Sequence, residues 1–124
     1  MHQNPQTNRI IAHIKSEYDV EPEFLWPERY PDYCIFRHSD NRKWFALIGT
    51  VPPATLGIDS NKKAEIINLK FDKGEALDFA ETSDHIFPAY HMNKNNWITI
   101  WLDGTLPNGL IFELIKKSYL LSAK

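Results

Sequence analysis

The segment from 97 to 102, Trp-Ile-Thr-Ile-Trp-Leu, constrains the fold most, because it reads as a strand with large apolar side chains on both faces. Side chains alternate between the faces of a strand. The two sets are Ile98, Ile100 and Leu102 on one face and Trp97, Thr99 and Trp101 on the other. The aliphatic set is ordinary core, whereas the tryptophans need either a second cover or a partner.

The remaining pattern predicts three helices and four more strands around this strand. A helix begins at Asn4-Pro5, and Asp72 with Glu75 resembles a capping box that opens a second helix. The proline-rich stretch 19–32 is expected to be an anchored loop. The expected elements are helix 5–18, strands 33–38, 44–51 and 64–70, helix 72–82, strands 86–92 and 97–102, and helix 107–121.

This order, α-β-β-β-α-β-β-α, favours an α+β fold. Three strands in succession and two more after a helix predict a two-layer domain, with a mostly antiparallel five-stranded sheet and the helices on one face. A chain of 124 residues with 43% hydrophobic residues suits a single domain over residues 1–124.

Composition narrows the cellular setting. The sequence contains no apolar run long enough to cross a bilayer and no signal-peptide pattern at Met1, so no membrane association is expected. Cys34 is the single cysteine, which favours a reducing cytoplasmic location. The formal net charge of −2 is unlike that of an indiscriminate polyanion binder.

No motif predicts catalysis, a metal or a cofactor. His85 and His91 are six residues apart, a spacing that matches no familiar metal site. Cys34 has no adjacent base or cation to activate it, and no Gly-rich phosphate loop follows a strand. We therefore expect a non-enzymatic protein without a cofactor.

Local basic and aromatic clusters stand out in this acidic chain. Arg37-His38 and Arg42-Lys43-Trp44 surround the first predicted hairpin, and the segment 91–97 carries a lysine, three asparagines and Trp97. Such a mixture suits nucleic acid, because cations neutralise phosphates, rings stack on bases and asparagine reads base edges. The alternative is that Trp44, Trp97 and Trp101 simply cover the second face of the sheet.

Seven short motifs between about Arg9 and Tyr119 also carry a family resemblance. The motifs are Tyr30-Pro31-Asp32, Phe36-Arg37-His38, Lys43-Trp44-Phe45-Ala46-Leu47-Ile48, Asn68-Leu69-Lys70, Pro88-Ala89-Tyr90-His91-Met92-Asn93-Lys94, Trp97-Ile98-Thr99-Ile100 and Leu102-Asp103-Gly104. In this order they resemble the MmcQ/YjbR family of bacterial proteins. The resemblance implies a small α+β fold similar to type III secretion chaperones and to frataxin-like proteins, described as a double-wing DNA-binding domain.

The resemblance also implies an exposed winged surface. The residues it would carry are Arg37, His38, Lys43, Trp44, His91, Asn93, Lys94 and Trp97. Our hypothesis is that Arg37, Lys43 and Lys94 contact phosphates, Trp44 or Trp97 stacks or wedges, and Asn93 meets a base edge.

Two other functions remain open at this stage. The secretion-chaperone resemblance suggests a protein-interaction module, in which Trp97 and Trp101 would anchor a partner protein or a homodimer. A small metabolite site beside His38 and His91 is a third possibility.

Overall fold

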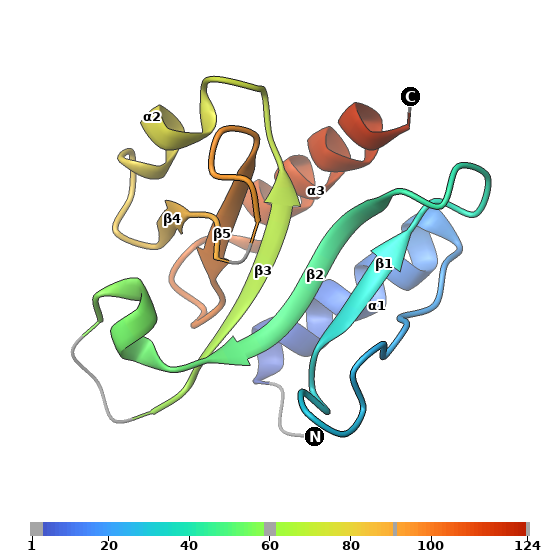
Figure 1. Ribbon diagram of the computed structural model, residues 1–124, viewed down its shortest axis with the longest axis horizontal. Coiled ribbons are helices and arrows are strands. Elements are labelled where there is room, and N and C mark those ends of the chain that lie inside the picture. Colours follow the sequence, from blue (N-terminus) through green and yellow to red (C-terminus); the bar gives the residue numbers. More distant parts are fainter. Residues whose placement is uncertain (1–3, 59–61, 91, 124) are drawn as a thin grey trace.

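The computed structural model describes residues 4–58, 62–90 and 92–123 and shows the predicted α+β architecture. The elements are α1 (Pro5–Tyr18), β1 (Cys34–Arg37), β2 (Trp44–Val51), the 3₁₀ turn η1 (Pro53–Leu56), β3 (Ala64–Lys70), α2 (Ala76–Ala80), β4 (Ile86–Pro88), β5 (Trp97–Trp101) and α3 (Asn108–Ser122). The five strands form one antiparallel sheet in the order β1-β2-β3-β5-β4 (Figure 1).

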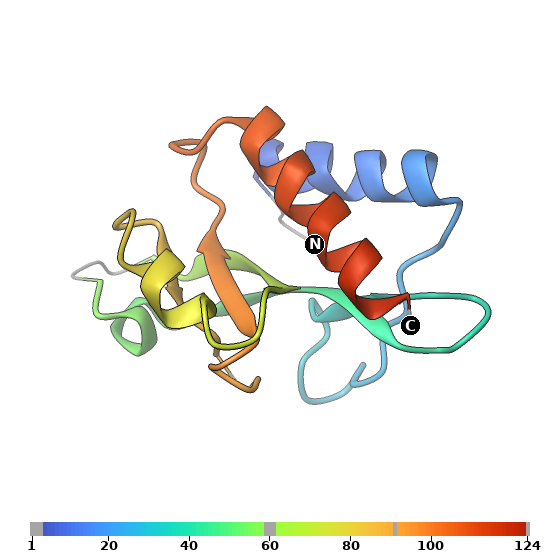
Figure 2. The same ribbon diagram turned by 90° about the horizontal axis from the view of Figure 1, so that it is seen from above.

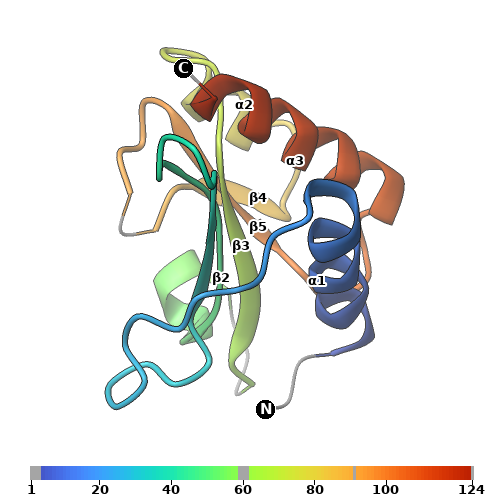
Figure 3. The same ribbon diagram turned by 90° about the vertical axis from the view of Figure 1, so that its right-hand side faces the viewer.

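The two long helices lie on the same face of this sheet. Figures 2 and 3 show α1 and α3 together on one side, as the sequence predicts. The core between them contains the aliphatic face of β5, including Ile98 and Ile100, and the helix residues Ile10, Ile14 and Ile111, all fully buried. Burial of each such side chain contributes roughly 1.5–3 kcal/mol, so this layer is the main source of stability.

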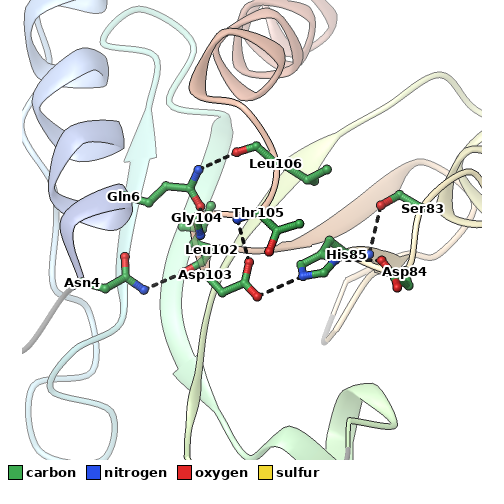
Figure 4. Close-up of polar contacts among 10 residues, drawn as sticks. All are labelled: Asn4, Gln6, Ser83, Asp84, His85, Leu102, Asp103, Gly104, Thr105 and Leu106. Atoms are coloured by element: carbon green, nitrogen blue, oxygen red, sulfur yellow. Dashed lines mark hydrogen bonds and ion pairs between the residues drawn. The ribbon is translucent and has the colours of Figure 1, made fainter.

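The amino-terminal end of α1 is tied to the segment that follows β5. The Asn4 side chain caps the helix by accepting from the Thr7 amide at 2.9 Å, which confirms the predicted cap. Its Nδ2 also donates to the Leu102 carbonyl, and Gln6 exchanges hydrogen bonds with the Leu106 carbonyl and the Gly104 amide (Figure 4). These bonds join residues about one hundred positions apart in the chain and fix where α1 begins.

Two expected elements differ from the prediction. The strand expected over 86–92 keeps only Ile86–Pro88, because Tyr90 leaves the sheet edge and turns onto the sheet face. The helix expected from Asp72 begins at Ala76 without a side-chain cap. Asp72 instead pairs with Lys117 of α3 at 2.6 Å, and the chain turns through Gly74 at φ 84°.

Loops cover the face of the sheet opposite the long helices. A second apolar cluster lies there, formed by Tyr33, Ile35, Leu47, Val51, Ala64 and Ile66. Packed against it are Trp26 from the proline-rich loop, Tyr90, and the strand residues Trp44 and Trp101. The prediction of an anchored loop is confirmed, and Trp44 and Trp101 do help to cover this face.

Both edges of the sheet are short. At the β1 edge, Glu23 and Ile35 exchange two backbone hydrogen bonds of 2.9 Å, so the 19–33 loop pairs with the strand. At the other edge, β4 has three residues and ends in Pro88, which has no amide hydrogen to offer.

A substitution at Gly49 tests how closely Tyr33 packs on the loop-covered face of the sheet. A Cβ added there would lie 2.8–2.9 Å from three ring atoms of Tyr33, which is itself buried. We expect Gly49→Ala to lower the free energy of unfolding by about 1–3 kcal/mol, measured by urea denaturation. Gly109→Ala is the matched control, because nothing lies within 4 Å of its added Cβ. Equal stability of the two variants would contradict this packing.

Candidate functional site

The register of the sheet brings three turns to one end. Arg37 pairs with Trp44 across the β1–β2 hairpin, and Lys70 pairs with Trp97 where β3 ends and β5 begins (Figure 1). The turns 38–43, 71–75 and 93–96 follow from these pairings, and the amides of Phe71 and Gly74 donate to the Asn96 and Asn95 carbonyls at 2.8 Å. Five cations lie on or beside these turns, and we name this region the basic end. They are Arg42, Lys43, Lys70, Lys73 and Lys94.

Two predicted contact residues are held by other side chains. Arg37 Nε donates to Glu23 Oε2 at 3.0 Å, in an ion pair that joins β1 to the proline-rich loop. His38 is only 4% exposed and its Nε2 lies 2.9 Å from Ser122 Oγ at the end of α3. The expectation of an exposed position is wrong for His38, because its ring packs between Phe45 and Tyr119.

Three other predicted residues are exposed on the turns. Lys43 lies at the end of the first turn, and Asn93 and Lys94 lie before β5. Lys94 Nζ reaches back and donates to the Ala89 carbonyl at 2.9 Å, while Asn93 Oδ1 accepts from the Asn95 amide. His91 lies outside the described residues.

The tryptophans divide between two settings. Trp44 is half-buried and its ring lies 5.9 Å from that of Trp26 at an interplanar angle of 78°. Trp101 is also half-buried, with the His85 imidazole stacked on it at 4.6 Å and 11°. Trp97 is half-buried at the start of β5. Trp44 and Trp97 therefore both border the basic end, and Trp44 also belongs to a larger ring cluster.

That ring cluster surrounds a cavity of about 250 Å³ on the loop-covered face of the sheet. We name it the aromatic cavity; its lining residues are Trp26, Tyr30, Tyr33, Trp44, Leu47, Asn68, Tyr90 and Met92. A wider hollow of about 650 Å³ adjoins it through the shared tyrosines Tyr30, Tyr33 and Tyr90. No sequence pattern predicted this cavity, although Tyr30, Tyr33 and Tyr90 lie within or beside the motifs that carried the family resemblance.

A buried polar network shapes one wall of the aromatic cavity. Asn68, fully buried in β3, donates from Nδ2 to the Tyr90 carbonyl at 2.8 Å and accepts from Thr99 Oγ1. Thr99 Oγ1 in turn accepts from the Tyr90 amide at 2.9 Å. These three bonds hold Tyr90 over the sheet, since breaking any of them would leave a buried polar group unpaired.

Burial dominates the titration of the groups near this wall. It raises the pKa of Tyr33 to about 12, with further contributions from Tyr90, Asp32 and Tyr30. Burial, and secondarily Asp32, raises the pKa of the Cys34 thiol to about 12. Both groups are therefore neutral at physiological pH, and Cys34 lacks the thiolate that a nucleophile requires.

His85 forms a separate charged cluster with Asp84 and Asp103, near Trp101 at the end of β5. Its Nδ1 lies 2.8 Å from Asp84 Oδ1 and its Nε2 lies 2.9 Å from Asp103 Oδ2 (Figure 4). Burial lowers the pKa of His85, but the two carboxylate partners outweigh it and the pKa lies above its usual range. Within residues 4–58, 62–90 and 92–123, no group of three His, Cys, Asp or Glu is arranged to hold a metal ion.

The fold and this site define a class: a small α+β domain with two long helices on one sheet face and an aromatic, loop-covered opposite face. The chain belongs to the YjbR family, whose model matches residues 16–121. It is 41% identical over 113 residues to YyaQ of Bacillus subtilis (strain 168), covering 91% of this chain and 94% of that one. The name of that relative, uncharacterized protein YyaQ, states no activity.

Solved structures show the same fold. A crystal structure of a Pseudomonas syringae protein, 39% identical, superposes with a TM-score of 0.87 and covers 97% of this chain and 99% of that one. The Deinococcus radiodurans protein DR2400, of the DUF419 domain, is 26% identical with a TM-score of 0.65, covering 92% of this chain and 78% of its own. In the described part of the chain, none of the helices has the length and apolar character needed to cross a bilayer.

The cluster around His85 predicts a pH-dependent stability. A raised folded-state pKa means that the protonated ring stabilises the fold fully below the unfolded pKa of roughly 6.5, and that this stability is lost as pH rises through the folded value. We expect the free energy of unfolding lost in His85→Gln to be larger at about pH 5.5 than at about pH 8.5, measured by urea denaturation.

His13→Gln supplies a control of opposite sign. Burial lowers the pKa of His13, which stacks on Phe112 at 3.8 Å, so its protonation opposes folding at low pH. The cost of removing His13 should therefore rise with pH. The same pH trend in both variants would refute the assignment.

Proposed function

We propose that this protein binds DNA through the basic end of the sheet. The observation that supports the proposal is the register, which gathers the turns 38–43, 71–75 and 93–96 on the same end although they are up to about fifty residues apart in sequence. Two of these turns, 38–43 and 93–96, at one end of a sheet suit the double-wing description that the family resemblance implies. Arg and Lys on such turns can neutralise the phosphates of a nucleic-acid backbone.

The charge at this end is positive in a chain that is acidic as a whole. Five cations on and beside the three turns face three carboxylates, Asp40, Asp72 and Glu75. Asp72 is engaged by Lys117 of α3, which reduces its opposition to an approaching phosphate. The local excess is modest, so we expect affinity in the micromolar range and strong dependence on salt.

Under this proposal the residues suggested by the sequence have different roles. Among the predicted cations, Lys43 and Lys94 are exposed and would contact phosphates, while Asn93 offers an exposed amide. Arg37 would contribute only by exchanging its bond with Glu23, and His38 supports the first turn from beneath through Ser122.

Fluorescence anisotropy of labelled duplex and single-stranded DNA tests the proposal. Removal of two phosphate contacts by the double variant Lys43→Ala and Lys94→Ala should weaken binding about ten-fold and reduce the slope of log K against log salt by about 1.8 on duplex DNA. The titration is run at low salt and again near physiological salt.

A double variant of equal charge, Lys62→Ala with Lys63→Ala, is the matched control, because both lysines are exposed just before β3, at the opposite end of that strand. It should bind as the unmodified protein does. Equal losses in the two double variants would mean that only net charge matters. An absence of binding at low salt would contradict the proposal and favour the alternative, a protein-interaction module.

A further inference from the structure

The aromatic cavity has a composition unlike that of an ordinary gap beneath a loop. Five of its eight lining residues are aromatic, and none of the described residues that line it is charged. Its rings are not stacked flat on one another: Trp26 stands nearly perpendicular to Trp44 at 78° and to Tyr33 at 89°. Because these rings meet nearly at right angles, they leave space between them that an occupant can fill.

The size of the aromatic cavity limits its occupant. Pockets for drug-sized ligands hold roughly 300–1,000 Å³, so a cavity of about 250 Å³ suits one flat ring system with a short attachment. Aromatic walls favour a ligand with a π face, because offset stacking and edge-to-face contact are both available there.

The polar groups of the cavity wall are satisfied within the protein. Asn68 is fully buried, donates one amide hydrogen to the Tyr90 carbonyl and accepts one bond at Oδ1 from Thr99. Recognition of an occupant therefore rests on stacking against the rings and not on hydrogen bonds to Asn68.

Two cations of the basic end lie beside residues that line the cavity. Lys43 precedes the cavity residue Trp44, and the ammonium of Lys94 is bonded to the carbonyl of Ala89, which precedes the cavity residue Tyr90. An occupant of the cavity that carried phosphates would have a cation near the wall on each side. A nucleotide unit within a strand has this combination of a flat ring and flanking phosphates.

We propose that the aromatic cavity receives one unpaired base of single-stranded DNA, whose backbone runs along Lys43 and Lys94; this inference rests on the proposed DNA-binding function. The base stacks on Trp44. A base inside a duplex is stacked and paired and cannot enter, so the protein binds single strands more tightly than duplexes of the same length.

The experiment compares strands of equal charge that differ only in their bases. Anisotropy is measured with a thymidine oligonucleotide of about twelve residues and with an abasic strand of the same number of phosphates. We expect the thymidine strand to bind about ten-fold more tightly, because stacking is lost in the abasic strand. This comparison needs no variant, so it stands even if a cavity substitution fails to fold.

Variants then test whether the difference in affinity between the two strands arises in the cavity. Trp44→Leu should weaken binding of the thymidine strand about ten-fold and leave the abasic strand unchanged, while Trp44→Phe restores most of the loss. Trp101→Leu is the matched control, since it removes a tryptophan from the same sheet face outside the cavity lining. Thermal unfolding of each variant confirms that the fold is retained.

The outcomes separate this inference from the function on which it rests. Salt-dependent binding that is equal for both strands and unchanged in Trp44→Leu would overturn the base site and leave the DNA-binding proposal standing. Binding of deoxythymidine monophosphate, seen as shifts of the Trp44 and Tyr33 resonances, without binding of either strand would overturn both proposals and indicate a site for a free nucleotide. No binding of any of these probes would overturn both.

Discussion

A buried amide on the loop-covered face of the sheet controls much of the rest of this structure. Asn68 lies in the middle of β3 with no exposure to water. Its hydrogen bonds to Tyr90 and Thr99 offset the free-energy cost of burying a polar amide. Satisfying it requires the chain after β4 to leave the sheet edge and lie across the face. That crossing shortens β4, positions Tyr90 as a wall and leads the chain back to the basic end.

The sequence predicted an element correctly where the burial of its side chains and the local preference of its residues favoured the same secondary structure. The alternation from Trp97 to Leu102 and the Asn4-Pro5 helix start both act within a few residues, and both were predicted correctly. The predicted start of α2 was wrong because a distant partner competed with the local one. Asp72 could cap a helix, yet an ion pair with Lys117, forty-five residues away, holds its carboxylate elsewhere.

The candidate site was less predictable because its parts meet only in three dimensions. Local reading marked the basic residues and Trp44, but His38 carries the same polar signature and is buried against Ser122, which only the docking of α3 explains. The aromatic cavity depends on Trp26 and Tyr30 folding over β2 and β3 from a proline-rich loop. Nothing in that loop's own sequence says which strands it will cover.

The two protected edges of the sheet have a consequence for how molecules of this protein can meet. An open edge strand invites pairing with another chain and, in the extreme, fibrous growth. Here the Glu23–Ile35 bridge occupies part of the β1 edge, and Pro88 closes a three-residue strand at the other. Intermolecular extension of the sheet is therefore disfavoured on both sides. Self-association is favoured through a face of the molecule, where side chains rather than backbone groups decide the partner.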